Sequence, residues 1–550
     1  MALLRFDKLS FAYPNADKRA LDNISFEMEE GEYVVLCGPS GCGKTTMLLQ
    51  AKPELAPAGA REGEVLYSNV PVNKLDGMKA ATEIGFVQQN PDNQIVTDFV
   101  WHELAFGLEN MGLSTSAIRR RVAEMASFFG METWFRKKTT EISGGQKQLL
   151  NLASVMAMEP KLLILDEPTA MLDPLAARTL LDTVKRINKD LGVAVLMTEH
   201  RLEEVFPAAD RVVLMDSGKL LADGEPKTIA SALAGEKDKS RLYFGLPSAV
   251  RIFAELESES MPLTVRDGRL SMKKLLGDKK VSESDRAQKE KTKKQKNDWV
   301  LKAEELWFRY DEKGADILRG LDLELRRGEI LCLLGGNGAG KTTLMKLLSG
   351  IKQPYRGKIG AAKDTKICML PQNVQSIFTY DTVERELLES ADGSSEHAGE
   401  IAEFLEIDTL LKRHPYDLSG GEAQRAAIAK LLLHKGNVLL LDEPTKGLDA
   451  YAKKRLAGML RKITGEGCSI LIVTHDVEFA ASYVDRCALM FDGIVISADS
   501  PHEFFSGNKF YTTDANRIAA EYFPSAITCE EVIALCKNCL SANGQRQPPC

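Results

Sequence analysis

The sequence predicts an α/β protein with two similar halves, each built on a mainly parallel sheet. The chain has 550 residues, which is long for a single domain. A glycine-rich stretch at 38–46 recurs almost intact at 335–343. Each copy follows an apolar, strand-like run, at 33–37 and at 330–334, and leads into a plausible helix. A strand–loop–helix unit that occurs twice indicates a duplicated α/β domain.

Composition excludes several classes of protein. With 44% hydrophobic and 27% charged residues, the chain is typical of a globular protein. Its formal net charge of −7 argues against a general nucleic-acid binder, so we expect no nucleic-acid partner. The first residues lack a signal-peptide pattern, and we find no uncharged apolar run of about 18 residues. Ten scattered cysteines favour a reducing, cytoplasmic compartment.

The two glycine-rich stretches have the composition of phosphate-binding loops. Their glycines let backbone N–H groups converge on phosphate oxygens at a helix N-terminus. Lys44 and Lys341 can contact β- and γ-phosphates, and the hydroxyls of Thr45 and Thr342 can bind Mg²⁺. The residues expected to bind nucleotide here are Gly38, Pro39, Ser40, Gly41, Cys42, Gly43, Lys44, Thr45 and Thr46, and Gly335, Gly336, Asn337, Gly338, Ala339, Gly340, Lys341, Thr342 and Thr343.

An aromatic residue precedes each loop by a similar distance. Tyr13 and Tyr310 could each stack on adenine. A single tyrosine at a strand end more often packs in the core, but the repetition favours stacking.

A glutamine follows the next apolar strand of each half and could reach Mg²⁺ or the attacking water. We assign Gln89 in preference to Gln88, because Gln89-Asn90 aligns with Gln372-Asn373. A polar cluster that merely ends a strand is the alternative interpretation.

Two short Ser-Gly-Gly motifs each begin an Ala/Leu-rich helical stretch. A hydroxyl cap followed by glycines leaves N–H groups and the positive end of the helix dipole free for an anion. An ordinary capped helix is the alternative for a single motif. The residues are Ser143, Gly144, Gly145 and Gln146, and Ser419, Gly420, Gly421 and Glu422.

Two apolar strands end in paired carboxylates. Asp166 and Asp442 are placed to hold Mg²⁺, while Glu167 and Glu443 can accept a proton from water that attacks the γ-phosphate. From the motif serine to this aspartate both halves count 23 residues (166−143 and 442−419). The constant spacing indicates a fixed core with variable insertions before it.

A histidine follows one further strand in each half. His200 and His475 lie 34 and 33 residues after the aspartates (200−166 and 475−442), although the chain has only seven histidines. Each imidazole could contact γ-phosphate or position the water.

Together these motifs resemble the ATP-binding cassette (ABC) ATPases, whose A-loop, Walker A, Q-loop, signature, Walker B, D-loop and H-loop motifs all occur twice. The resemblance implies ATP and Mg²⁺ as cofactors. It also implies two P-loop NTPase domains, each with a parallel core, an antiparallel β subdomain and a helical signature subdomain. Within this family, residues 89–94, 106–110 and 244–250 look like the ATPases of energy-coupling factor (ECF) transporters, which import vitamins and cobalt or nickel.

The family likeness also implies head-to-tail pairing of the halves, with each ATP between the Walker A loop of one and the signature of the other. Site one would join Lys44, Thr45, Gln89, Asp166, Glu167 and His200 to Ser419 and Gly421. Site two would join Lys341, Thr342, Gln372, Asp442, Glu443 and His475 to Ser143 and Gly145. Because both retain a glutamate and a histidine, we expect both to hydrolyse ATP. Mg²⁺ would be held by Thr45, Gln89 and Asp166, and by Thr342, Gln372 and Asp442.

The expected domains are a first ATPase domain at 1–235, a small appendage at 236–270, a charged flexible linker at 271–298, a second ATPase domain at 299–505 and a C-terminal segment at 506–550. The linker holds ten Lys/Arg against five Asp/Glu. Cys536 and Cys539 have zinc-like spacing, and Cys529 and Cys550 lie nearby, but one CxxC pair is weak evidence for a metal site.

The leading hypothesis is a fused double ATPase that powers an ECF-type importer from the cytoplasmic face of the membrane. Its partners would be a separate transmembrane subunit and a small membrane-embedded substrate-binding subunit. Two alternatives stay open: a twin-cassette ABC ATPase that acts on the ribosome, and the ATPase of a sugar or peptide importer.

Overall fold

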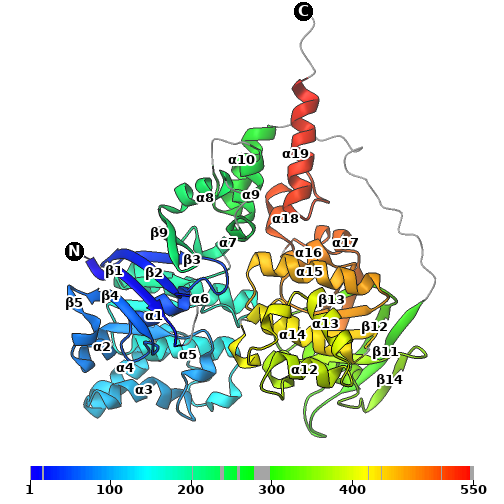
Figure 1. The fold of residues 1–550 in the computed structure, drawn as a ribbon, viewed down its shortest axis with the longest axis horizontal. Helices are drawn as coiled ribbons and strands as arrows, with labels where there is room; N and C mark the ends of the chain where they lie inside the picture. Colours follow the sequence, from blue (N-terminus) through cyan, green and yellow to red (C-terminus); the bar gives the residue numbers. More distant parts are fainter. Residues whose placement is uncertain are drawn as a thin grey trace, which may run out of the picture. The chain divides into compact units, whose positions relative to one another are not determined.

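The computed structural model describes residues 2–14, 18–200, 202–235, 241–256, 261–277, 298–418, 420–434, 436–509 and 511–544. The chain forms two compact units, Met1–Val250 and Arg251–Cys550, called the first and second half below. In Figure 1 the first half runs from blue to green, and the second from green to red.

The core of the first half is a six-stranded sheet with the order β10-β9-β3-β8-β7-β6. Within this sheet five strands run parallel and β10 is antiparallel to β9. All residues of β3, β6, β7 and β8 are buried, as expected for parallel strands covered on both faces. The strands are β3 (Tyr33–Cys37), β6 (Ile84–Val87), β7 (Leu162–Asp166), β8 (Ala194–Thr198), β9 (Arg211–Asp216) and β10 (Lys219–Gly224).

An antiparallel sheet and a helical subdomain complete the first half. The sheet has the order β2-β1-β4-β5, and its buried Phe6 and Phe11 belong to the same core cluster as Met47 of the first helix. Its strands are β1 (Ala2–Ala12), β2 (Leu21–Glu29), β4 (Ala60–Tyr67) and β5 (Val70–Pro71). The helical subdomain, between β6 and β7, contains α3 (Val100–Asn110), α4 (Thr115–Phe128) and α5 (Gly144–Met156). The other helices are α1 (Lys44–Gln50), α2 (Gly77–Glu83), α6 (Pro174–Leu191), α7 (Leu202–Val205) and α8 (Pro226–Gly235).

The second half repeats this architecture. Its six-stranded sheet has the order β15-β16-β17-β13-β18-β19, and a three-stranded antiparallel sheet has the order β12-β11-β14. The strands are β11 (Trp299–Phe308), β12 (Leu318–Arg326), β13 (Ile330–Leu334), β14 (Arg356–Ala361), β15 (Ile367–Leu370), β16 (Val438–Asp442), β17 (Ser469–Val473), β18 (Arg486–Phe491) and β19 (Ile494–Asp499). The helices are α11 (Lys341–Leu348), α12 (Val383–Ser390), α13 (Ser395–Phe404), α14 (Gly420–Leu433), α15 (Ala450–Gly465), α16 (Val477–Tyr483) and α17 (Pro501–Ser506). The predicted fold class is therefore confirmed.

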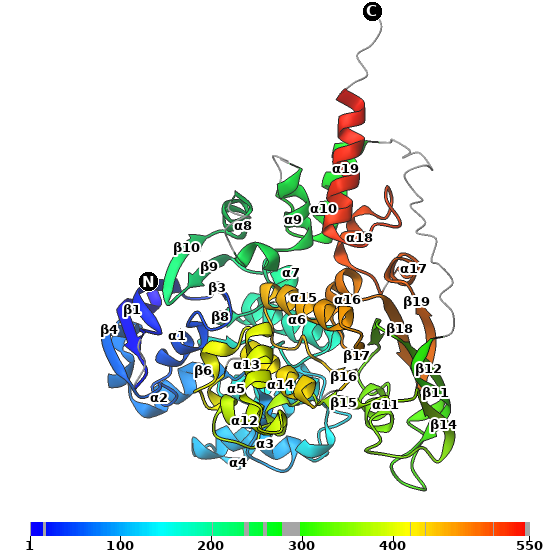
Figure 2. The same cartoon turned by 45° about the vertical axis from the view of Figure 1, so that its right-hand side comes forward.

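At the start of the second half, a helix packs against the C-terminal segment of the chain. Helix α9 (Ser248–Glu255) spans the boundary between the halves, and α10 (Val265–Leu276) lies beside α18 (Asp514–Ala519) and α19 (Cys529–Gly544) within the second half (Figures 1 and 2). Cys536 Sγ lies 3.6 Å from Met272 Sδ, and the Tyr522 hydroxyl donates to the Gly277 carbonyl at 2.8 Å. We call these helices the tail cluster.

The tail cluster changes the expected domain boundaries. Helix α10 runs to Leu276 and so enters the stretch from 271 that we expected to be linker. Met272 and Leu276 are both buried one helical turn apart, which explains why this stretch is ordered. The remainder of the expected linker, residues 278–297, lies outside the described residues, as does Cys550.

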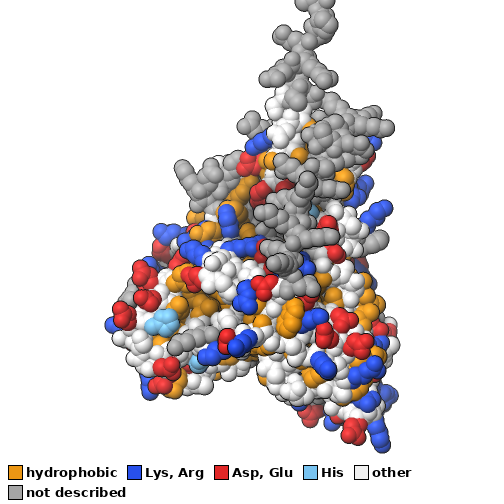
Figure 3. Space-filling model, turned by 90° about the vertical axis from the view of Figure 1, so that its right-hand side faces the viewer, with side chains coloured by type: hydrophobic (Ala, Val, Ile, Leu, Met, Phe, Trp, Pro, Cys, Tyr) orange, Lys and Arg blue, Asp and Glu red, His pale blue; other side chains and the backbone are white. Residues whose placement is uncertain are grey.

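Neither a membrane span nor a metal cluster is found among the described residues. None of their helices combines the length and the apolar character needed to cross a bilayer. No three His, Cys, Asp or Glu side chains in this part of the chain are grouped to hold a metal ion. On the face shown in Figure 3, basic and acidic side chains are interspersed.

A buried ion pair stabilises the helical subdomain of the second half. Glu386, on α12, is 1% exposed and accepts hydrogen bonds from the backbone N–H groups of Thr379 and Tyr380. Lys430 Nζ, on α14, lies 2.6 Å from Glu386 Oε2. In the first half Glu103 accepts the N–H groups of the corresponding loop, and Ser154 occupies the position of Lys430 when each helix is counted from its motif serine (154−143 and 430−419).

We predict that Lys430→Met destabilises the second half by roughly 2–4 kcal/mol, because it leaves the buried Glu386 carboxylate without its cation. Calorimetric unfolding checks this prediction, with Ser154→Ala as the matched control at the corresponding position of the first half. The control should cost less than about 1 kcal/mol. An unchanged unfolding profile for Lys430→Met would contradict the assigned role of the pair.

Candidate nucleotide and catalytic sites

In both halves the phosphate-binding loop joins a buried strand to a helix. Gly43 and Gly340 precede the first helical residue with φ of 107° and 103°, in the left-handed region where glycine is favoured. Lys44 Nζ donates to the Gly38 carbonyl at 2.9 Å, and Lys341 Nζ donates to the Gly335 carbonyl at 2.8 Å. Each ammonium group is thereby held over its own loop.

Close backbone approach also requires glycine at the start of each loop. A Cβ atom on Gly38 would lie 2.3 Å from the Met215 carbonyl oxygen, and one on Gly335 would lie 2.4 Å from the Met490 carbonyl oxygen. Real Cβ atoms do not approach this closely. By contrast, a Cβ on Gly336 would meet no atom within 4 Å.

A hydroxyl and a carboxylate meet at the first turn of each helix. Thr45 Oγ1 donates to Asp166 Oδ1 at 3.1 Å, and Thr342 Oγ1 donates to Asp442 Oδ2 at 2.9 Å. Burial raises the pKa of Asp166 to about 6, and it also raises the pKa of Asp442. Such desolvated oxygen ligands fit Mg²⁺, a hard cation whose charge would favour the ionised carboxylates.

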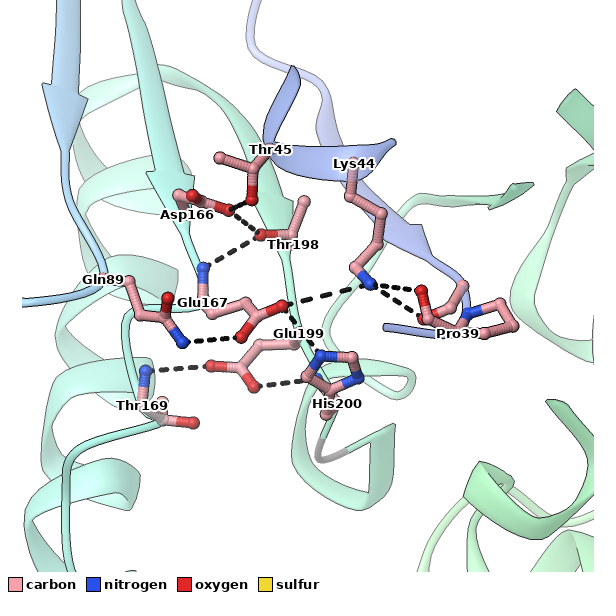
Figure 4. Close-up of polar contacts among 11 residues, drawn as sticks. Pro39, Lys44, Thr45, Gln89, Asp166, Glu167, Thr169, Thr198, Glu199 and His200 are labelled. Atoms are coloured by element: carbon pink, nitrogen blue, oxygen red, sulfur yellow. Dashed lines mark hydrogen bonds and ion pairs between the residues drawn. The ribbon is translucent and has the colours of Figure 1, made fainter. Parts of the chain in front are cut away.

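In the first half three side chains converge on Glu167 (Figure 4). Gln89 Nε2 donates to Glu167 Oε2 at 2.9 Å, and His200 Nε2 lies 2.7 Å from Glu167 Oε1. Lys44 Nζ is 3.9 Å from the same Oε1. The structure therefore brings together the glutamine, glutamate, histidine and lysine that the sequence assigned to site one. It is Gln89, and not Gln88, whose amide reaches the glutamate.

The second half forms a similar but looser cluster. His475 Nε2 lies 3.2 Å from Glu443 Oε1 and 3.3 Å from Lys341 Nζ. Gln372 is exposed, and among the described residues it makes no hydrogen bond to Glu443. Burial raises the pKa of Glu443 to about 7, opposed by the charge of Lys341. A carboxyl group near this value is well matched to general-base chemistry at neutral pH.

The two glutamates share an unusual backbone conformation. Glu167 and Glu443 have φ of 42° and 54°, in the left-handed region that non-glycine residues rarely adopt. This conformation costs roughly 1–3 kcal/mol and persists only where surrounding structure enforces it. Here the Glu167 N–H donates to Thr198 Oγ1 at 2.9 Å, whereas the Glu443 N–H donates to the Val473 carbonyl at 2.8 Å.

The two tyrosines occupy equivalent positions. The Tyr13 hydroxyl lies 3.1 Å from Thr46 Oγ1, and the Tyr310 hydroxyl lies 3.2 Å from Thr343 Oγ1. The two residues are 40% and 53% exposed, so each keeps a surface on which a base could stack.

Ser143 caps α5 as expected from its motif. The Gln146 N–H donates to Ser143 Oγ at 3.3 Å, and the Ser143 N–H donates to Gln146 Oε1 at 2.9 Å, which forms a capping box. Gly144 and Gly145 form the first turn. In the second half α14 begins at Gly420, followed by Gly421 and Glu422, while Ser419 lies outside the described residues.

Sequence reasoning missed two polar residues of the first cluster. Thr198 Oγ1 donates to Asp166 Oδ1 at 2.9 Å, and Glu199 is 2% exposed beside His200. The signal was present in the repeat, because Thr198-Glu199-His200 aligns with Val473-Thr474-His475. The first half thus has a threonine where the second has a valine, and a glutamate where the second has a threonine. The two clusters differ at these positions.

We predict that Gly335→Ala removes one of two ATP-binding sites, because its methyl group would displace the second loop from the Met490 carbonyl. Equilibrium dialysis with labelled ATP should then find one nucleotide per chain. Gly336→Ala is the matched control in the same loop and should keep two. Two bound nucleotides in Gly335→Ala would show that the close approach does not matter.

The comparisons with known proteins agree with this geometry. A family model described as ABC transporter matches residues 21–170 and 318–446. A Bacillus anthracis protein provisionally named an ABC transporter ATP-binding protein is 42% identical over 546 residues, with 96% of this chain and 98% of that protein covered. Bacillus subtilis YkoD, provisionally named an HMP/thiamine import ATP-binding protein, is 32% identical over 523 residues, with 92% of each covered.

A solved structure extends the likeness to the fold of both halves. The archaeal ribosome recycling factor aABCE1, solved in complex with the ribosomal stalk protein aP1, gives a TM-score of 0.57 with 90% of each chain covered. At 20% identity this likeness shows the fold alone. The family match includes both phosphate-binding loops, and the relatives cover nearly the whole chain. The chain therefore belongs to the ABC transporter family, as a tandem ATP-binding protein with one ABC ATPase domain in each half.

Proposed function

We propose that this protein hydrolyses ATP at two composite sites to drive an ECF-type importer of a vitamin or a transition metal ion. The observation that carries the hydrolytic part is the duplicated glutamate–histidine–lysine cluster at the carboxyl ends of corresponding strands. The import part is supported by the likeness to a protein named for HMP/thiamine import.

The cluster of the first half suits an in-line attack of water on the γ-phosphate. Glu167 would accept the proton of the attacking water, whose oxygen bonds to phosphorus as the bond to the leaving ADP oxygen breaks. His200 and Gln89, which contact the two carboxylate oxygens, would orient that glutamate and the water. Lys44 would stabilise charge on the transferred phosphoryl group.

Thr45 and Asp166 would hold Mg²⁺ in the first half, and Thr342 and Asp442 in the second; when bound, the ion would offset charge on the β- and γ-phosphates. Gln89 is proposed to complete the first metal site. The exposed Gln372 would have to move to do the same in the second.

We propose that the halves pair head to tail, so that Ser419 and Gly421 complete site one, and Ser143 and Gly145 complete site two. The helix N-termini of α5 and α14 supply the physical reason, since the positive end of a helix dipole favours an anion. Closure on ATP and opening after hydrolysis would then move a separate transmembrane subunit. A small membrane-embedded subunit would select the cargo.

We predict that Glu167→Gln and Glu443→Gln each leave partial ATP turnover, whereas the double variant loses roughly 100-fold or more, the usual cost of removing a general base. Steady-state phosphate release measures this. Glu30→Gln is the control, since Glu30 is an exposed glutamate in the turn after β2. Complete loss of turnover in either single variant would show that the two sites are not independently competent.

Affinity purification of the tagged protein from detergent-solubilised cells tests the proposed partners. We expect stoichiometric recovery of a multi-span membrane protein and a small hydrophobic subunit, and that subunit would indicate the cargo. Recovery of ribosomal proteins without a membrane protein would instead favour the ribosome-associated class of twin ABC ATPases. Recovery of a different pair of membrane subunits, those of a sugar or peptide importer, would favour that alternative.

A further inference from the structure

Glu199 is a buried carboxylate between strand β8 and the catalytic-site histidine. It is 2% exposed. Its Oε1 accepts the backbone N–H of Thr169 at 3.0 Å, and its Oε2 accepts the backbone N–H of His200 at 3.0 Å (Figure 4). Thr169 belongs to the loop that follows Glu167, so one side chain joins the two loops that carry the glutamate and the histidine.

The second half builds the same junction differently. Thr474 holds the position of Glu199, and its hydroxyl lies 2.9 Å from the hydroxyl of Thr445, the counterpart of Thr169. Thr474 Oγ1 also accepts the N–H of Asp476 at 3.1 Å. The second half thus has a neutral hydroxyl pair where the first half has a carboxylate that accepts two N–H groups.

Thr169, whose backbone N–H donates to Glu199, has an unsatisfied side-chain hydroxyl within the described part of the chain. Thr169 is fully buried, and its Oγ1 has no hydrogen-bond partner among the described residues. An unsatisfied buried hydroxyl and a buried carboxylate are both unfavourable for folding. The hydroxyl pair of the second half avoids both costs, so fold stability alone does not account for Glu199.

We propose that Glu199 is a positioning residue that fixes the His200 loop against the Glu167 loop and thereby sets the hydrolytic rate of the first site separately from the second. Hydrogen bonds to an ionised acceptor are stronger than neutral ones, and Glu199 accepts two of them from the two loops, so this junction is stiffer than the hydroxyl pair. Consistent with this, the histidine–glutamate distance is 2.7 Å in the first half and 3.2 Å in the second. The inference rests on the proposed role of Glu167 as the general base.

The test is Glu199→Thr in a Glu443→Gln background, where turnover reports the first site. The new hydroxyl can pair with Thr169 Oγ1 as Thr474 pairs with Thr445, so the variant has a precedent for folding in the same chain. We expect the turnover number to fall about tenfold, because small misplacements of catalytic groups are costly, with the KM for ATP changed less than about twofold. The melting temperature should be no lower than that of the background, because the hydroxyl pair avoids both folding costs described above.

Glu199→Gln is the second variant, since it keeps the shape but can offer an acceptor to only one of the two N–H groups. We expect a similar fall in turnover. An unchanged turnover number in both variants would overturn the proposal, and so would a fall that only parallels a lower melting temperature. Failure of the underlying assignment has a different signature. Full turnover in the Glu167→Gln, Glu443→Gln double variant would show that neither glutamate is the general base.

Discussion

Each half depends on one constraint: carboxylates placed at the buried carboxyl end of a parallel strand must be compensated there. Asp166 is compensated by two hydroxyl donors, and Glu167 by an imidazole, an amide and a more distant ammonium group. These partners come from helix α1, from strand β8 and from the loops after β6 and β8, and all of them lie at the carboxyl end of the sheet because the strands are parallel. The side chains that compensate the two carboxylates are therefore the ones that the parallel strands bring to the same end of the sheet.

The α/β fold class and the placement of the motifs were predictable because the signals are local and occur twice. The apolar runs that became β3 and β7 are followed directly by the loop glycines and the paired carboxylates. Other contacts depend on three-dimensional geometry that a motif does not encode. Gln89 reaches Glu167 while its aligned counterpart Gln372 is exposed, although both follow the same kind of strand. Glu199 was missed because one carboxylate after a strand resembles an ordinary polar loop residue.

The two halves share their strand architecture more closely than they share their charged residues. The strand orders of the two main sheets match position by position, and both glutamates keep the same left-handed backbone. Around them the charges diverge: the first half adds the Glu199 carboxylate, and the second adds Lys446, whose pKa is lowered by burial, near Glu443. A shared backbone with different neighbouring charges allows two sites to have the same chemistry at different rates.

The tail cluster has a consequence for how the chain folds during synthesis. Met272 is buried against Cys536, a partner 264 residues further along the chain. Helix α10 therefore leaves the ribosome long before the helices that cover it, and its apolar face stays unpaired while the whole second ATPase core is made. Helix α19 therefore completes a structure begun near the middle of the chain. This part of the second half can finish folding only after α19 has been made, and removal of α19 would expose the apolar surface of α10.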